Sequence, residues 1–165
     1  MSWSRKSFVW GDPKLTGKIL PMYQSDTFES VDADLLVIFE QLRRREPIFH
    51  TPEFGSTVPD FANAMAPDYW EVGASGRRYS RDFILRMFED NPPLNAATEE
   101  WETRGFGFRR IGPDTYLMTY TLRQKARLTR RCTIWQGNAD HWQILYHQGT
   151  VVTAEEDDVV PSPIE

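Results

Sequence analysis

The sequence predicts one α+β domain in which helices pack on a curved, mostly antiparallel β-sheet. Two stretches in the first 95 residues carry apolar side chains at helical spacing, and residues 98–151 read as four strands joined by turns. Elements of these two kinds, segregated along the chain, are typical of an α+β layer architecture. A chain of 165 residues with 40% hydrophobic residues is long enough to bury such a core.

The first helix is expected to begin at Ser30 or Asp32, because either side chain can cap it. Three arginines at 43–45 fall in its last turn, where cations interact favourably with the helix dipole, and Pro47 ends it. Its apolar face is formed by Leu35, Ile38, Phe39 and Leu42.

Three short elements are expected between the first helix and the strands. Residues 61–65 form one or two helical turns, and residues 69–73 form a strand followed by a turn at Ser75-Gly76. Ser80 caps a second helix, which ends at residues 91–93, Asn-Pro-Pro.

The hairpin turns of the last four strands are predicted at 112–114, 125–128 and 137–140. In the tightest register of the first hairpin, Glu102 opposes Arg123. This register places Gly105 and Gly107 on the concave, helix-facing side, where glycine lets a sheet curl. The same side collects Tyr116, Met118, Tyr120 and Leu122, whereas Phe106 and Phe108 fall on the outer side and form a candidate interface.

The final hairpin is predicted from two tryptophans, Trp135 and Trp142, that flank its turn. If both lie on one face, Arg131, Tyr146 and Gln148 face the helices and His147 faces outward. A slip of one residue would instead bring Cys132 and Ile134 inward.

Two motifs resemble the nuclear transport factor 2-like superfamily, which has a cone-shaped, cystatin-like fold. Residues 68–76, DYWEVGASG, and residues 142–150, WQILYHQGT, are similar to patterns of an uncharacterised, SnoaL-like bacterial branch. The resemblance covers residues 32–153 and implies the fold. It implies no single activity, because the superfamily includes ketosteroid isomerases, polyketide cyclases, dehydratases, hydrolases and transport adaptors.

The chain is expected to have three parts, namely an irregular N-terminal arm at 1–30, the cone domain at 31–153 and an acidic, disordered tail at 154–165. Five of the 24 acidic residues lie in the last eleven residues, and the remaining 19 match the 19 lysines and arginines of residues 1–154. A neutral body has no electrostatic attraction to nucleic acid or to anionic lipid, so neither is expected as a partner. The N-terminus lacks the apolar segment of a signal peptide, which predicts a cytoplasmic protein.

Glu71 is the candidate catalytic residue that the resemblance implies, because an isomerase-type cone needs a carboxylate base in an apolar pocket. A tyrosine would supply the hydrogen bond to the developing oxyanion. If Arg131 pairs with Glu71, however, the pKa of the carboxyl falls and the role of Glu71 is structural. The predicted ligand-binding residues are Glu71, Tyr120, Arg131, Trp135, Tyr146 and Gln148.

Three functions stay open at this point. The leading hypothesis is a cone domain that binds a small molecule, with no cofactor. The alternatives are an isomerase, cyclase or dehydratase with Glu71 as general base, and a protein-interaction domain whose cavity is filled by its own aromatic side chains. A homodimer through the open sheet face is expected. No metal site is expected, because Cys132 is the single cysteine and the histidines lack metal-ligand spacing.

Overall fold

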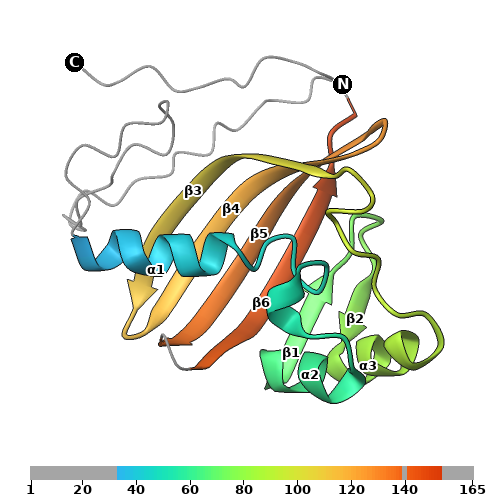
Figure 1. Ribbon diagram of the computed structural model, residues 1–165, viewed down its shortest axis with the longest axis horizontal. Helices are drawn as coiled ribbons and strands as arrows, with labels where there is room; N and C mark the ends of the chain where they lie inside the picture. The colour runs from blue at the N-terminus through green and yellow to red at the C-terminus, as the bar shows by residue number, and fades with distance from the viewer. Residues whose placement is uncertain (1–32, 139–140, 154–165) are drawn as a thin grey trace, which may run out of the picture.

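The computed structural model describes residues 33–138 and 141–153, in which helices cover one face of a six-stranded sheet (Figure 1). The expected arm at 1–30, the acidic tail at 154–165 and the helix-capping residues Ser30 and Asp32 lie outside the described residues. The described α+β architecture with a curved sheet is the one that the sequence predicts.

Among the described residues, three helical segments precede the first strand, and a side-chain cap marks the start of the third. The first, α1, spans Ala33–Arg43. A one-turn 3-10 helix η1 (Pro52–Phe54) and the helix α2 (Val58–Ala64) follow, and α2 begins with a capping box between Thr57 and Asp60.

The last helix, α3 (Arg81–Asp90), begins at Ser80 as expected. The Ser80 hydroxyl accepts a hydrogen bond of 3.4 Å from the backbone N–H of Phe83, which satisfies one of the free donors of the first turn. Ile84 and Phe88, one turn apart, are buried and fix the face of α3 that packs inward.

The six strands form one sheet in the order β2-β1-β6-β5-β4-β3. Neighbouring strands are antiparallel except β1 and β6, which are parallel. The short edge strand β2 was not predicted. The strands are β1 (Met65–Val72), β2 (Arg78–Ser80), β3 (Glu102–Gly112), β4 (Thr115–Gln124), β5 (Arg127–Asn138) and β6 (His141–Val151).

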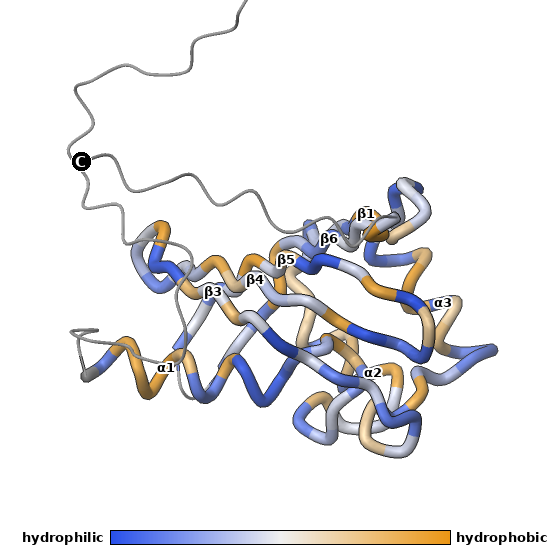
Figure 2. The backbone as a smooth tube through the Cα atoms, turned by 90° about the horizontal axis from the view of Figure 1, so that it is seen from above, coloured by the Kyte–Doolittle hydropathy of each residue, from blue (hydrophilic) through white to orange (hydrophobic). Residues whose placement is uncertain are grey.

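The hydrophobic core lies between the sheet and the helices. Figure 2 shows the sheet as one layer with α1 and α2 on the same side of it. The α1 residue Phe39 packs on Phe106 and Phe108 of β3, at ring-centroid distances of 6.3 and 5.6 Å. The largest fully buried side chain is Trp135 of β5.

A β-bulge in β3 overturns the predicted facing of its phenylalanines. Glu102 pairs with Arg123 as expected, but the register shifts between Arg104 and Gly107, where Gly105 has a φ of +63°. This shift reverses the alternation of side chains beyond the bulge. Phe106 therefore stacks on Tyr120 on the helix-facing side, with ring centroids 5.2 Å apart. The prediction that Phe106 and Phe108 form an outer interface is wrong.

A second bulge reverses the end of β6. Ile134 pairs with Tyr146 while Trp135 pairs with Ile144, so Leu145 is an extra residue in the ladder. His147 consequently faces inward and is only 3% exposed. The predicted inward orientation of Tyr146 and Gln148, and the predicted outward orientation of His147, are therefore wrong. On β5, Thr133 and Trp135 are buried with Arg131 on the same side, as expected.

Candidate functional site

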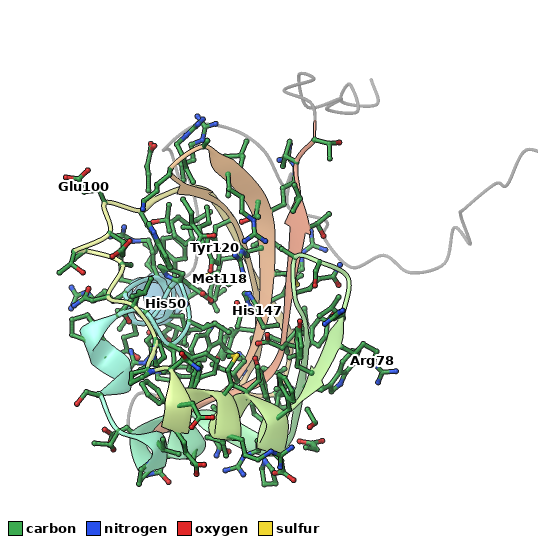
Figure 3. All side chains as sticks on the ribbon, turned by 90° about the vertical axis from the view of Figure 1, so that its right-hand side faces the viewer. His50, Arg78, Glu100, Met118, Tyr120 and His147 are labelled. Carbon is green, nitrogen blue, oxygen red and sulfur yellow. The ribbon has the colours of Figure 1, made fainter. Side chains whose placement is uncertain are left out.

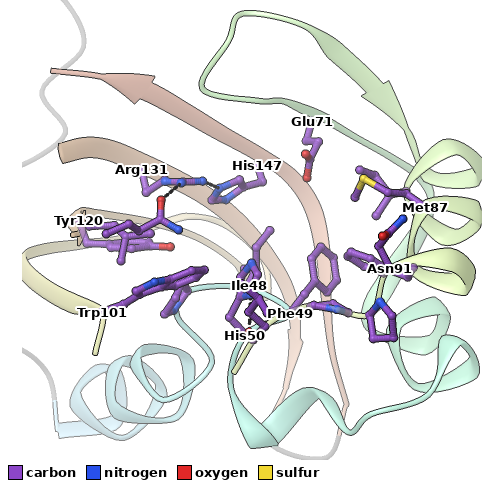
Figure 4. Close-up of a pocket in the computed structure, with 18 residues that line it drawn as sticks. Ile48, Phe49, His50, Glu71, Met87, Asn91, Trp101, Tyr120, Arg131 and His147 are labelled. Atoms are coloured by element: carbon purple, nitrogen blue, oxygen red, sulfur yellow. Dashed lines mark hydrogen bonds between the residues drawn. The ribbon is translucent and has the colours of Figure 1, made fainter. Parts of the chain in front are cut away.

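A cavity of about 320 Å³ lies on the helix-covered side of the sheet. Strands β1, β4, β5 and β6 form one wall of the cavity, and α3 with segments 47–50 and 91–101 forms the others (Figure 4). The sheet supplies Glu71, Tyr120, Arg131 and His147 to the cavity wall, and His50 and Asn91 add polar side chains from outside the sheet. On the opposite side, apolar side chains such as Met87 face it.

Strand pairing brings these polar residues together from distant parts of the sequence. Glu71 of β1 is the register partner of His147 of β6, and His147 is the partner of Thr133 of β5. One step along the strands, Arg131 of β5 is the partner of Tyr120 of β4. Side chains of directly paired residues lie on the same sheet face, so all five reach the cavity side. Figure 3 shows Tyr120 and His147 on the concave side of the strands.

Glu71 is a half-buried carboxyl at the cavity wall. One of its oxygens, Oε2, accepts a hydrogen bond of 2.5 Å from the hydroxyl of Tyr69, which is two residues earlier on the same face of β1. Burial raises the pKa of Glu71, although the Tyr69 hydrogen bond and the charge of Arg131 lower it in part. Within residues 33–138 and 141–153, Glu71 forms no ion pair with Arg131. The structural pairing that would make Glu71 a poor base is therefore not formed.

The guanidinium of Arg131 donates hydrogen bonds to three neutral side chains. Nε donates to Thr129 (2.9 Å), Nη1 donates to His147 Nε2 (3.2 Å) and Nη2 donates to Gln124 (3.4 Å). The side chain lies over Gly149 of β6, where an added Cβ would be 3.1 Å from Nη1. Burial lowers the pKa of Arg131 from its usual value.

His147 is neutral in this arrangement, and its tautomer follows from its neighbours. Because an arginine has no acceptor, His147 Nε2 must accept the hydrogen bond from Arg131. The proton therefore resides on Nδ1, which donates to the Thr133 hydroxyl 3.0 Å away. Burial and the nearby charge of Arg131 hold the pKa of His147 well below its usual value.

Glu46 lies behind this wall and was not identified from the sequence. Its carboxyl accepts hydrogen bonds from the Tyr120 hydroxyl (2.8 Å), the Trp135 indole (3.1 Å) and the backbone N–H of Ile48 (3.2 Å). Thr133 contributes another hydrogen bond. Burial outweighs these donors and raises the pKa of Glu46 to about 7. Tyr120 and Thr133 thus link a buried proton-binding group to the cavity wall.

His50 and Trp101 form the side of the cavity that faces the sheet. The His50 ring lies against Trp101, with ring centroids 4.7 Å apart, and its Nδ1 is 2.7 Å from the carbonyl oxygen of Leu94. The backbone N–H of Ala96 donates to the His50 carbonyl oxygen (2.9 Å). These contacts attach the segment before β3 to the loop after α1. Burial lowers the pKa of His50.

Three of the six predicted ligand-binding residues line the cavity together, namely Glu71, Tyr120 and Arg131. Trp135 is fully buried beneath it and donates to Glu46 instead. Tyr146 and Gln148 lie on the outer sheet face, where the Tyr146 hydroxyl donates to Gln148 (2.6 Å). The bulge at Leu145 is the reason for this misplacement.

Four residues of this region were not predicted as site residues from the sequence, namely His147, His50, Trp101 and Glu46. For His147 no sequence signal was present, because the bulge that turns it inward carries no glycine or proline. Glu46 precedes the apolar run Pro47-Ile48-Phe49, and a lone acid beside a buried run is a weak sign of a buried carboxyl.

The described residues also limit the class of site. In this part of the chain, no three His, Cys, Asp or Glu side chains lie close enough together to hold a metal ion. None of its helices has the length and apolarity that crossing a bilayer requires.

Comparisons with known proteins identify the fold. No protein-family model matches the chain, and no curated protein sequence matches it. Three similar solved structures are a DUF3225-family protein of unknown function from Pectobacterium atrosepticum, a cystatin-like fold protein from Burkholderia xenovorans, and a protein of the nuclear transport factor 2-like family from Streptomyces avermitilis that is proposed to be a dehydratase.

The similarity to these three structures extends over most of the domain but is low in sequence. Their TM-scores are 0.55, 0.56 and 0.56, and their sequence identities to this chain are 16%, 13% and 16%. The matches cover 74%, 74% and 73% of this chain and 94%, 95% and 99% of the respective structures. Identity at this level identifies the fold and not the activity. The chain has a cystatin-like cone fold, similar to the folds of these solved structures.

Proposed function

We propose that this protein binds a small organic molecule in the cavity between the sheet and α3. The observation that carries the proposal is the cavity itself, whose volume of about 320 Å³ falls within the range of roughly 300–1,000 Å³ for small-molecule sites. A domain that used the cone only for protein contacts, with the cavity filled by its own aromatic side chains, would not leave this space.

The two sides of the cavity differ in character, which indicates an amphiphilic ligand. Glu71, Arg131 and His147 supply polar groups from the sheet, whereas Phe49 and Met87 face them with apolar surface (Figure 4). Phe49 is 6% exposed and packs among four other aromatic rings, so the apolar wall is preformed. A few converging polar groups on an otherwise apolar wall orient a ligand without requiring the protein to rearrange.

Acid–base catalysis by Glu71 is the second candidate function. Burial raises the pKa of Glu71, which makes its carboxylate a stronger base, and no described cation forms an ion pair with it. Arg131, on the same sheet face, could stabilise negative charge that develops on a substrate oxygen. This arrangement suits removal of a proton next to a carbonyl group, as in an isomerase or a dehydratase.

A thermal-shift screen against a library of metabolites tests the proposal. Ligands of the cavity raise the melting temperature of the wild type, and Glu71→Gln weakens or abolishes the shift for those that contact Glu71. The matched control is Glu102→Gln, which removes a carboxylate of the same type that is 62% exposed at the start of β3. If no compound binds, or if both variants lose the same ligands, the proposal fails.

Exchange of carbon-bound ligand protons with solvent distinguishes ligand binding from catalysis. For each compound that binds, 1H NMR in D₂O follows exchange of the protons next to its carbonyl group. Catalysis predicts exchange with wild type and with Glu102→Gln but a loss of at least a hundredfold with Glu71→Gln. Binding without exchange assigns the cavity to ligand binding alone.

We also propose a homodimer through the outer sheet face. On this face Trp70 is 39% exposed, its ring lies 4.6 Å from that of Tyr146, and the Arg78 guanidinium is 4.6 Å from the Trp70 ring centre. Sedimentation velocity should show that Trp70→Glu shifts a dimer to monomer whereas Val37→Glu, on the exposed face of α1, does not.

Membership of the SnoaL-like branch, a bacterial source and a cytoplasmic location stay predictions from the sequence.

A further inference from the structure

Arg131 is a partly buried cation that faces the cavity without an ionic partner in the described part of the chain. The ion pairs among residues 33–138 and 141–153 join Arg43 to Glu40 and Arg123 to Glu102. Removing a guanidinium from water is costly unless an anion compensates it. The free protein therefore holds at the cavity wall a charge that a bound anion would neutralise.

The hydrogen bonds of Arg131 leave donors for a ligand. A guanidinium has five N–H groups, and three are used by Thr129, His147 and Gln124. One N–H remains on each of the two terminal nitrogens. The three protein acceptors are all neutral, so they orient the guanidinium and leave its charge unpaired.

The carboxyl groups nearest to Arg131 are engaged elsewhere. Glu71 accepts the Tyr69 hydroxyl, and Glu46 accepts the Tyr120 hydroxyl and the Trp135 indole. Both influence Arg131 electrostatically, but neither lies within 4 Å of it in an ion pair. The position next to the guanidinium is thus open on its cavity side.

We propose that Arg131 anchors the carboxylate of a small organic acid whose apolar part lies against Phe49, Met87 and Trp101. This inference rests on the proposed function of the cavity and names the class of its ligand. Two terminal N–H groups of a planar guanidinium match the two oxygens of a carboxylate. Gly149 allows this position of Arg131, because the absence of a Cβ leaves room for the guanidinium next to β6.

A monoanion fits this cavity better than a phosphate ester. Arg131 is the only arginine or lysine among the residues that line the cavity in the described chain. His147 and His50, the other basic groups there, are held neutral by burial at neutral pH. A phosphate dianion would bring twice the charge to one cation, and a charged Glu71 on the same wall would repel a dianion about twice as strongly as a monoanion.

Matched pairs of acids and amides test this inference directly. The probes are phenylacetate, benzoate and hexanoate, each compared with its own primary amide, and the affinities are measured by isothermal titration calorimetry on the full chain. The acids should bind at least tenfold more tightly than the amides. Arg131→Gln should remove this preference, Arg131→Lys should keep part of it, and Arg109→Gln, an exposed arginine on β3, should leave it unchanged.

Gly149→Ala provides a second variant in case Arg131→Gln does not fold. The new methyl group would displace the guanidinium by a few tenths of an ångström without removing its charge. The acid affinity should fall severalfold, and the amide affinity should not change.

The outcomes distinguish failure of this inference from failure of the proposed function. Equal affinities for an acid and its amide, or unchanged acid affinity in Arg131→Gln, would overturn the carboxylate assignment while leaving the small-molecule cavity intact. No binding of any probe, acid or amide, would overturn both the assignment and the cavity's proposed role toward molecules of this size.

Discussion

Glu46 has a buried carboxyl group whose ionisation is coupled to the cavity through two hydroxyl groups. Tyr120 connects it to the cavity directly, and Thr133 connects it to His147. When Glu46 is ionised, the Tyr120 hydroxyl donates to it and is not available as a donor to a ligand. Protonation of Glu46 would release that donor. At the scale of single residues, the wall of the cavity is therefore a connected set of hydrogen bonds and not a collection of independent groups.

The raised pKa of Glu46 predicts how stability depends on pH. Because the pKa is about 7 in the folded protein and about 4.5 in the unfolded chain, the folded state binds an extra proton between these values. The contribution of Glu46 to stability is therefore fully present below about pH 4.5 and is lost as the pH rises to 7. The loss is about 3–4 kcal/mol, since one pKa unit corresponds to roughly 1.4 kcal/mol.

Urea denaturation of wild type and Glu46→Gln between pH 4.5 and pH 8 measures this contribution. His50 and His147 have lowered pKa values, so they destabilise the folded state as the pH falls and oppose the effect of Glu46 in the wild-type profile. Subtraction of the variant profile removes their contribution. The free energy of unfolding of the wild type should decrease relative to that of the variant as the pH rises. Parallel profiles would contradict a buried, proton-binding Glu46.

Two β-bulges determine which side chains the strands present to the cavity. The bulge at Gly105 turns Phe106 and Phe108 toward the helices, and the bulge at Leu145 turns His147 inward and Tyr146 outward. Each inserts one residue into a ladder whose side chains otherwise alternate strictly. At the scale of elements, the composition of the cavity wall depends on these two irregularities as much as on the identity of the residues.

The conformation of Gly105 gives a prediction for the first bulge. Its φ of +63° is strained for residues with a Cβ, although nothing lies within 4 Å of the position that a Cβ would occupy. Gly105→Ala should therefore destabilise the protein by about 1–2 kcal/mol through backbone strain alone. Gly105→Asn should cost less, because asparagine tolerates the left-handed region. Chemical denaturation of both variants checks the difference, and equal costs would argue against this backbone conformation.

At the scale of the whole molecule, the sequence predicts the architecture better than the site. Helical and strand periodicities average over many residues, so α1, α3 and the strands after residue 100 were located correctly. The inward facing of Tyr120 and Arg131 also followed from regular alternation. The inward facing of His147 did not, because one extra residue at Leu145 reverses the pattern and no glycine or proline marks the bulge. The burial of Glu46 was not predicted, because it depends on tertiary packing against Trp135 and Tyr120.

NMR of the tryptophan indole N–H groups tests most directly whether ligands bind in the cavity between the sheet and α3. The chain contains six tryptophans, and each gives one indole N–H signal. Addition of a compound that raises the melting temperature should shift the signal of Trp101, which lines the cavity, and leave that of Trp70 on the outer face unchanged. Tryptophan-to-phenylalanine variants assign the two signals. A ligand that shifts Trp70 and leaves Trp101 unchanged would contradict binding between the sheet and α3.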